Sequence, residues 1–122
     1  NINVERFKKI LREAAEQSGR ALVPQLQETQ DFSRALRRAV LLQAPNIILH
    51  PTGELIKDFC KHKDLFEVNI FVGPEGGFTD VELDAVRELR AGGRDVQIIS
   101  LGSRILRAET AGLVAAAYLL NR

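Results

Sequence analysis

Residues 68–77 read VNIFVGPEGG, and this stretch indicates both the fold and a place where a ligand can bind. Its first half, residues 68–72, is dominated by β-branched and aromatic side chains and predicts a buried strand. Its second half contains three glycines. Glycine lets a ligand approach the main chain closely and tolerates positive φ angles. A single glycine usually marks only a turn, but this cluster is denser than a turn requires, so we treat it as a candidate binding loop.

Two further apolar runs predict strands, at residues 46–50 and 96–101, and amphipathic stretches between them predict helices. We expect helices over 4–18, from Asp31 to before Pro45, over 54–61, from Thr79-Asp80 to before Gly92-Gly93, and from about Thr110 to Leu120. Gly19 suits the C-terminal turn of the first helix, and Thr79 and Glu82 have the spacing of a capping box. The last one is apolar nearly all round and is expected to be buried. Continuously apolar strands that alternate with helices indicate an α/β fold, with a parallel sheet flanked by helices on both faces.

In such a fold, ligands bind beyond the carboxyl ends of the strands. Three strand ends are therefore expected to meet, namely Leu49-His50, the loop from Gly73 to Gly77, and Leu101-Gly102. The glycine loop is not a P-loop, because no Lys-Ser/Thr pair follows it, and it is not the Gly-x-Gly-x-x-Gly of dinucleotide folds. We expect a ligand that main-chain groups recognise, although a general nucleotide site, for example for ATP, stays an alternative.

Composition bounds the class of protein. The 122 residues are 45% hydrophobic with a net charge of +1, as expected of one domain. Residues 1–63 carry 11 Lys and Arg against 7 Asp and Glu, so this half either faces phosphates or consists of solvated helices. The single Cys60 excludes an intrachain disulfide and fits a cytoplasmic protein. Two histidines and one cysteine without tight spacing predict no metal site, and the absence of a long apolar run predicts no membrane span.

Two other segments carry residues suited to chemistry. In residues 101–111, LGSRILRAETA, two arginines flank an Ile-Leu pair and a Glu-Thr pair opens the last helix. That pair alone could simply cap the helix and complement its dipole. In residues 13–20, EAAEQSGR, a polar helix end is the simplest interpretation.

Taken together, NIFVGPEGGFTDVEL (69–83), ISLGSRILRAETA (99–111) and EAAEQSGRALVP (13–24) resemble the motifs of bacterial small-subunit rRNA uridine-N3 methyltransferases, a family of the SPOUT superfamily. The resemblance covers essentially the whole chain. It implies a SPOUT-type fold with a C-terminal deep trefoil knot, and a homodimer built through the knotted region. It also implies S-adenosyl-L-methionine as cofactor and small-subunit ribosomal RNA, or the assembled small subunit, as partner.

The resemblance further implies which residues do the work. Residues implied to bind the cofactor are Leu49, His50, Gly73, Pro74, Glu75, Gly76, Gly77, Leu101, Gly102, Ile105, Leu106 and Thr110. Residues implied for catalysis are Arg20, Arg107 and Glu109. Members of the family usually carry an N-terminal RNA-binding domain and a first strand and helix that precede the segment matched here. Because the chain also contains no methionine, we expect residues 1–122 to be a fragment holding the methyltransferase domain.

Alternative functions remain open at this stage. Other SPOUT enzymes methylate ribose 2′-hydroxyls or act on tRNA, although their knot motifs differ from RILRAETA. A domain that kept the fold but lost catalysis would act as an RNA-binding module.

Overall fold

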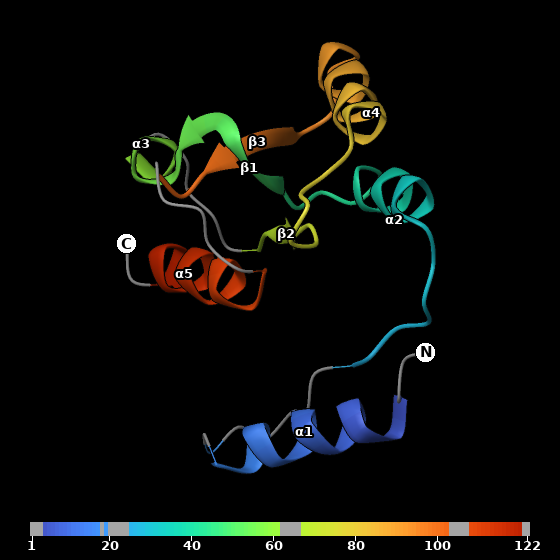
Figure 1. Ribbon diagram of the computed structural model, residues 1–122, viewed down its shortest axis with the longest axis vertical. Helices are drawn as coiled ribbons and strands as arrows, with labels where there is room; N and C mark the ends of the chain where they lie inside the picture. Colours follow the sequence, from blue (N-terminus) through green and yellow to red (C-terminus); the bar gives the residue numbers. More distant parts are fainter. Residues whose placement is uncertain (1–3, 18, 20–24, 62–66, 103–107, 121–122) are drawn as a thin grey trace. The chain divides into compact units, whose positions relative to one another are not determined.

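The computed structural model describes residues 4–17, 19, 25–61, 67–102 and 108–120. The chain forms two compact units, residues 1–30 and 31–122, which are described separately (Figure 1). The first unit contains helix α1, Val4–Gln17, which matches the expected helix over 4–18. Gly19 follows with a φ of +73°, and its N–H donates to the carbonyl of Glu16 across 3.2 Å. A glycine at this position ends the helix as the sequence predicts.

The second unit contains a three-stranded parallel sheet in the order β2-β1-β3. Its strands are β1 (Asn46–Leu55), β2 (Asn69–Phe71) and β3 (Val96–Ser100). Each coincides with an expected strand, but β1 continues past the expected end at residue 50. Leu49 and Glu54 both pair with Ile99, so residues 50–53 form an irregular excursion before the strand resumes. The parallel sheet predicted from the apolar runs is confirmed.

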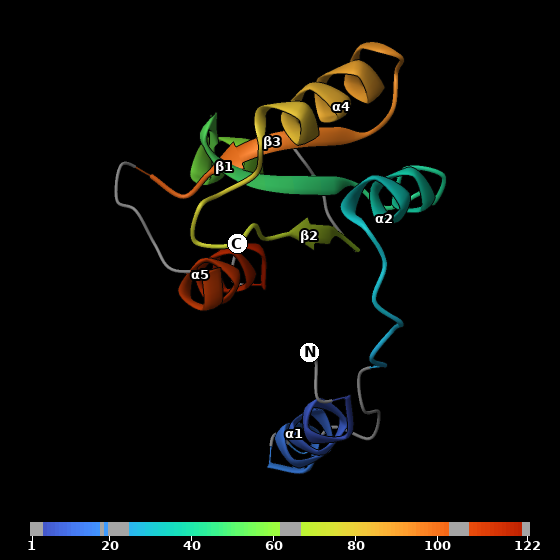
Figure 2. The ribbon, with the colours of Figure 1, turned by 45° about the vertical axis from the view of Figure 1, so that its right-hand side comes forward.

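Helices cover both faces of this sheet (Figures 1 and 2). On one face, Ile47, Leu49 and Ile99 form a core with α3 (Ile56–Lys61) and α5 (Ala108–Leu120). On the other face, Ile48 and Val96 form a second core with α2 (Phe32–Ala39) and α4 (Asp80–Ala91). Successive side chains of a strand point to opposite faces, which is why neighbouring residues of β1 belong to different cores.

Local sequence signals account for the starts of two helices. The Asp31 carboxylate accepts the Arg34 N–H across 3.3 Å at the start of α2. At the start of α4, the Thr79 hydroxyl accepts from the Glu82 N–H, and the Glu82 carboxylate accepts from the Thr79 N–H. This reciprocal capping box satisfies N–H groups that would otherwise lack partners.

Three helix predictions were wrong in detail. The helix expected over 54–61 begins at Ile56, because Glu54 and Leu55 pair with β3 as the end of β1. Helix α2 was expected to run up to Pro45, but it ends at Ala39. The N–H groups of Leu41 and Leu42 bond back to carbonyls three residues earlier, which tightens the chain into turns before β1. Helix α5 was expected to be buried all round. Ala115 and Leu119 are buried, but the side chain of Leu113 is 73% exposed and that of Tyr118 is 45% exposed, because the chain covers only one side of the helix.

Other expectations concern parts of the chain that the structure leaves open. The expected knot depends on the path of residues 103–107, which lie outside the described residues.

Cys60 packs half-buried against the α3–α5 core. Among the residues described, no cluster of three or more His, Cys, Asp or Glu is arranged to hold a metal ion. No helix in the described ranges has the length and hydrophobicity that a membrane span requires.

Candidate functional site

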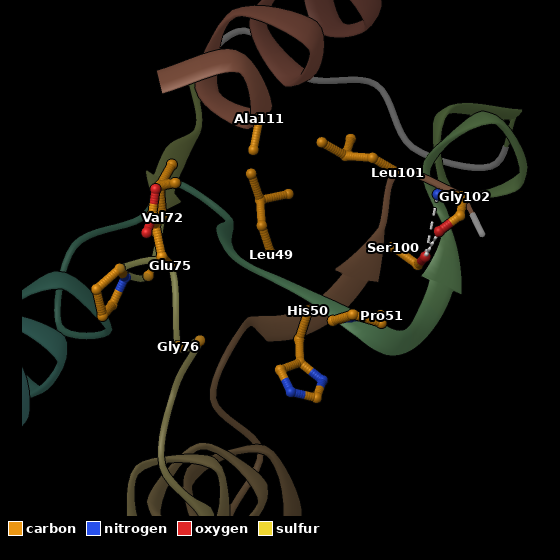
Figure 3. Close-up of a pocket in the computed structure, with 13 residues that line it drawn as sticks. Leu49, His50, Pro51, Val72, Glu75, Gly76, Ser100, Leu101, Gly102 and Ala111 are labelled. Atoms are coloured by element: carbon orange, nitrogen blue, oxygen red, sulfur yellow. Dashed lines mark hydrogen bonds between the residues drawn. The ribbon is translucent and has the colours of Figure 1, made fainter. Parts of the chain in front are cut away.

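A cavity of about 280 Å³ lies where β2 and β3 end and where the regular pairing of β1 is interrupted after Leu49 (Figure 3). Its size is near the lower end of the range typical of small-molecule sites, about 300–1,000 Å³. The residues that follow β2 and β3, the excursion within β1, and one residue of α5 line it. They are Leu49, His50, Pro51, Val72, Gly73, Pro74, Glu75, Gly76, Gly77, Ser100, Leu101, Gly102 and Ala111. The three predicted strand ends therefore converge on one pocket.

The excursion in β1 brings His50 and Pro51 to the pocket. His50 Nδ1 lies 2.8 Å from the Thr52 hydroxyl oxygen and accepts the Thr52 main-chain N–H across 3.3 Å. Because a main-chain N–H can only donate, this arrangement places the proton of the neutral ring on Nε2. Gly53 closes the excursion, and a Cβ there would overlap the main-chain carbonyl of Ile98. Only glycine allows the two strands to approach this closely.

The glycine loop forms the wall on the β2 side, across the pocket from the loop after β3 (Figure 3). A turn fixes it, since the Gly77 N–H donates to the Pro74 carbonyl across 2.8 Å, and Gly77 has a φ of +76°. A Cβ on Gly73 would lie 3.2 Å from the Phe78 ring, so Phe78 packs tightly beneath the loop. A Cβ on Gly76 would meet no heavy atom within 4 Å, so the space around this lining residue is open.

The loop after β3 is held by a side chain. Ser100 is only 4% exposed, and its hydroxyl accepts the Gly102 N–H across 3.1 Å while donating to the Gly102 carbonyl across 3.3 Å (Figure 3). Gly102 has a φ of +124°, a conformation that residues with a Cβ rarely adopt. The serine thus locks a glycine turn at the pocket wall.

The chemical character of the pocket is mostly apolar, with exposed main chain. Leu49 points toward Ala111 in Figure 3, and together with Val72 and Leu101 these residues supply the apolar surface. Among the described lining residues, His50 and Glu75 are the only titratable ones, and Glu75 carries the only formal negative charge. The N–H groups of Glu75 and Gly76 have no hydrogen-bond partner among the described residues. The pocket is suited to a ligand that has an apolar body and polar groups that can hydrogen-bond to the main chain.

Most of the residues implied for cofactor binding come together here. Nine line the pocket, namely Leu49, His50, Gly73, Pro74, Glu75, Gly76, Gly77, Leu101 and Gly102. Thr110 is exposed and is not one of the lining residues, whereas Ala111, next to it, is. Ile105 and Leu106 lie outside the described residues. That the nine residues bind a cofactor stays a prediction.

The residues implied for catalysis are less well defined. Arg20 and Arg107 lie outside the described residues. Glu109 belongs to the first turn of α5, which places its main chain two residues before the lining residue Ala111. Their roles therefore stay predictions.

Sequence reasoning missed four lining residues: Pro51, Val72, Ser100 and Ala111. Pro51 and Val72 neighbour predicted positions along the chain, so extending each strand end by one residue would have included them. Ser100 and Ala111 also neighbour predicted positions, but only the structure shows the bonds of Ser100 to Gly102 and the packing of Ala111 against the core.

A family model described as an RNA methyltransferase domain matches residues 1–120. The chain is 37% identical to Ribosomal RNA small subunit methyltransferase E of Rickettsia conorii, over 96% of this chain and 46% of that protein. It is 32% identical to the protein of the same name from Bacillus subtilis, over 91% of this chain and 44% of that protein. The chain thus spans less than half the length of these relatives.

Solved structures show the same likeness in three dimensions. A Legionella pneumophila protein, described in complex with the bound cofactor SAM, superposes with a TM-score of 0.76 at 30% identity, over 94% of this chain and 44% of that chain. Ribosomal RNA small subunit methyltransferase E from Neisseria gonorrhoeae, described as bound to S-adenosyl methionine, superposes with a TM-score of 0.70 at 33% identity. That match covers 95% of this chain and 44% of the other.

Proposed function

This chain belongs to the RNA methyltransferase domain family, and from that membership we propose that it takes part in methylating N3 of a uridine in small-subunit ribosomal RNA, with S-adenosylmethionine as methyl donor. The names of the relatives support the small-subunit RNA and the methyl transfer. The N3 position rests on the motifs GPEGG and RILRAETA, which this chain shares with uridine-N3 methyltransferases. The observation that carries the proposal is the convergence of three strand ends on one pocket.

The residues of the pocket fit such a cofactor. Gly76 lines the pocket with open space around it, and the N–H groups of Glu75 and Gly76, which have no partner among the described residues, are donors for a polar ligand. Leu49, Leu101 and Ala111 offer apolar surface for a base. S-adenosylmethionine carries its reactive methyl on a sulfonium, so it supplies the chemistry without a metal or a covalent nucleophile.

We assign the holding of the cofactor to the lining residues. The glycine loop from Gly73 to Gly77 and the turn at Leu101-Gly102 would contact it through main-chain groups, and His50 would border it from β1. Glu75 brings a negative charge that complements a cationic ligand. Ile105 and Leu106 would form an apolar slot for the adenine, and Thr110 would close the pocket, as the resemblance implies.

The RNA substrate imposes a second requirement. Uridine N3 carries a proton and becomes a good nucleophile only when that proton leaves. We propose that Arg20 and Arg107 stabilise the charge that develops on the base, and that Glu109 accepts the proton or orients Arg107. In the intact protein, Arg107→Ala should lower methyl transfer to small-subunit RNA without weakening cofactor binding. Unchanged turnover would remove Arg107 from the mechanism.

The direct test of the proposed function has two readouts. Calorimetric titration of the intact protein with S-adenosylmethionine should show binding, and excess ATP should not compete. Mass spectrometry of nucleosides from small-subunit RNA, after incubation with the protein and the cofactor, should show N3-methyluridine. A ribose-methylated nucleoside would assign another reaction of the same superfamily, and no cofactor binding at all would indicate an RNA-binding module.

We also propose that the protein acts as a homodimer in which α5 contributes to the interface. Leu113 and Tyr118 are large, exposed side chains of a helix that is apolar nearly all round. A helix that is apolar nearly all round is usually covered on all sides, so the exposed side of α5 is suited to contact a partner subunit. The same helix lines the pocket through Ala111, so a partner on α5 would lie near the site.

A further inference from the structure

Helix α2 has a basic face outside the pocket. It consists of Arg34, Arg37 and Arg38 and is called the arginine face below. All three residues are exposed, and Arg37 and Arg38 lie three and four residues after Arg34. Side chains at such spacing lie on the same side of a helix, one turn apart. The opposite side of α2 is anchored by Leu36, which is 1% exposed. The fold therefore fixes the three arginines outward.

The arginine face has no counter-charge of its own. Helix α2 contains no acidic residue, and its N-cap Asp31 is engaged with the Arg34 main-chain N–H. No ion pair between described residues includes Arg34, Arg37 or Arg38. Arg37 instead donates to the Ser33 hydroxyl across 2.9 Å. By contrast, Lys9, Lys61 and Arg87 each pair with a carboxylate on their own helix.

Packing ties α2 to the candidate site. The Phe32 ring, at the first residue of α2, packs edge-on against the Phe71 ring with 5.7 Å between centroids, and against the Phe78 ring at 5.1 Å. Phe71 ends β2 and Phe78 follows the glycine loop. Three aromatic rings thus connect the start of α2 to the wall of the pocket. The start of α2 therefore packs against the residues that flank the glycine loop.

We propose that the arginine face binds the phosphodiester backbone of the ribosomal RNA substrate. Guanidinium groups recognise phosphates through paired hydrogen bonds, and one helical turn separates Arg34 from Arg38. This inference rests on the proposed function, because that function supplies a polyanion as substrate. Phosphate contacts position a nucleic acid without reading its sequence. The arginine face accordingly sets how the RNA lies relative to the pocket, and the target uridine is selected elsewhere.

The test measures the affinity of the intact protein for a fluorescently labelled small-subunit RNA transcript at several salt concentrations. The variant is Arg34→Gln/Arg37→Gln/Arg38→Gln, and the matched control is Lys9→Gln/Lys61→Gln/Arg87→Gln, which removes the same charge from paired cations. Glutamine has nearly the helix propensity of arginine and lysine, so both variants should fold. The slope of log affinity against log salt should become shallower by about 2–3 in the arginine variant, because each phosphate contact contributes roughly 0.7–0.9. It should stay unchanged in the control.

The outcomes separate this inference from the proposed function. Calorimetric titration with S-adenosylmethionine should give the same affinity for the arginine variant and the wild type. A wild type that binds RNA through the arginines but binds no cofactor would contradict the proposed function and still support this inference. A salt slope that the arginine substitutions do not change, or that the control changes equally, would overturn the inference. The face, with the neighbouring Leu41 and Leu42, would then fit a protein partner instead.

Discussion

The side chain of Asn69 donates a hydrogen bond to the side-chain oxygen of Asn46 across 3.0 Å, at the start of two adjacent parallel strands. Asn46 is only 1% exposed, and its own amide nitrogen donates to the carbonyl of Asp95 across 3.0 Å, just before β3. One buried side chain therefore joins the entry points of all three strands. A buried polar group of this kind stabilises a fold only while every bond is made.

We expect Asn46→Ala to lower the free energy of unfolding by about 2–4 kcal/mol, since it removes several bonds and leaves a cavity in the core. Urea denaturation followed by circular dichroism measures this. Asn69→Ala, at a half-buried site with a single side-chain bond, is the control and should cost about 1 kcal/mol. Equal losses for the two variants would contradict the central role of Asn46.

Gly53 allows β1 to rejoin β3 after the excursion that carries His50. We expect Gly53→Ala to destabilise the protein by about 3 kcal/mol, because its Cβ would overlap the Ile98 main chain, which cannot move aside as a side chain could. Cofactor affinity should fall as well, since the excursion lines the pocket. Thermal unfolding and calorimetric titration measure the two effects.

The control for this substitution is Gly92→Ala at the end of α4. A Cβ there lies 3.5 Å from the nearest atoms, which is ordinary contact, and the φ of −79° suits alanine. This change should leave stability unchanged or raise it by about 0.5 kcal/mol. If Gly53→Ala behaved like Gly92→Ala, the close approach of the strands would not be required.

A substitution at Gly76 should change cofactor affinity without changing the stability of the fold. A Cβ at Gly76 meets nothing within 4 Å, and its φ is not positive, so Gly76→Val should fold with an unchanged melting temperature. Because Gly76 lines the pocket, we expect the new side chain to narrow the space for a ligand. We expect affinity for S-adenosylmethionine to fall by at least about tenfold, equivalent to about 1.4 kcal/mol, measured by calorimetry. Wild-type affinity in a folded Gly76→Val protein would place the cofactor elsewhere.

The features that depend on residues close together along the chain were predicted correctly. The Thr79–Glu82 capping box, the glycine end of α1 and the apolar strands are local patterns whose physics acts within a few residues. The convergence of the three strand ends was also predictable, because a parallel sheet brings its carboxyl ends to one edge.

Features that depend on distant contacts escaped prediction. The extension of β1 to Leu55 requires Gly53 to meet Ile98, a residue far along the chain. Ala111 lines the pocket only because α5 packs against the sheet there. The exposure of Leu113 was missed for a different reason. The sequence shows that the helix is apolar, but it does not show whether the same chain or a partner buries each side of it.

Leu113 provides the test of the proposed homodimer. Its side chain is 73% exposed, so Leu113→Glu should not disturb the fold of one subunit, but a buried carboxylate without a partner would break an interface. Sedimentation equilibrium should show a dimer for the wild type and a monomer for this variant. Val81→Glu is the matched control, because Val81 is 79% exposed on α4, at the other face of the sheet, and should leave the dimer intact. Because α5 also lines the pocket, loss of the dimer should weaken cofactor binding too. A Leu113→Glu protein that stayed dimeric, or a wild type that sedimented as a monomer, would exclude α5 as the interface.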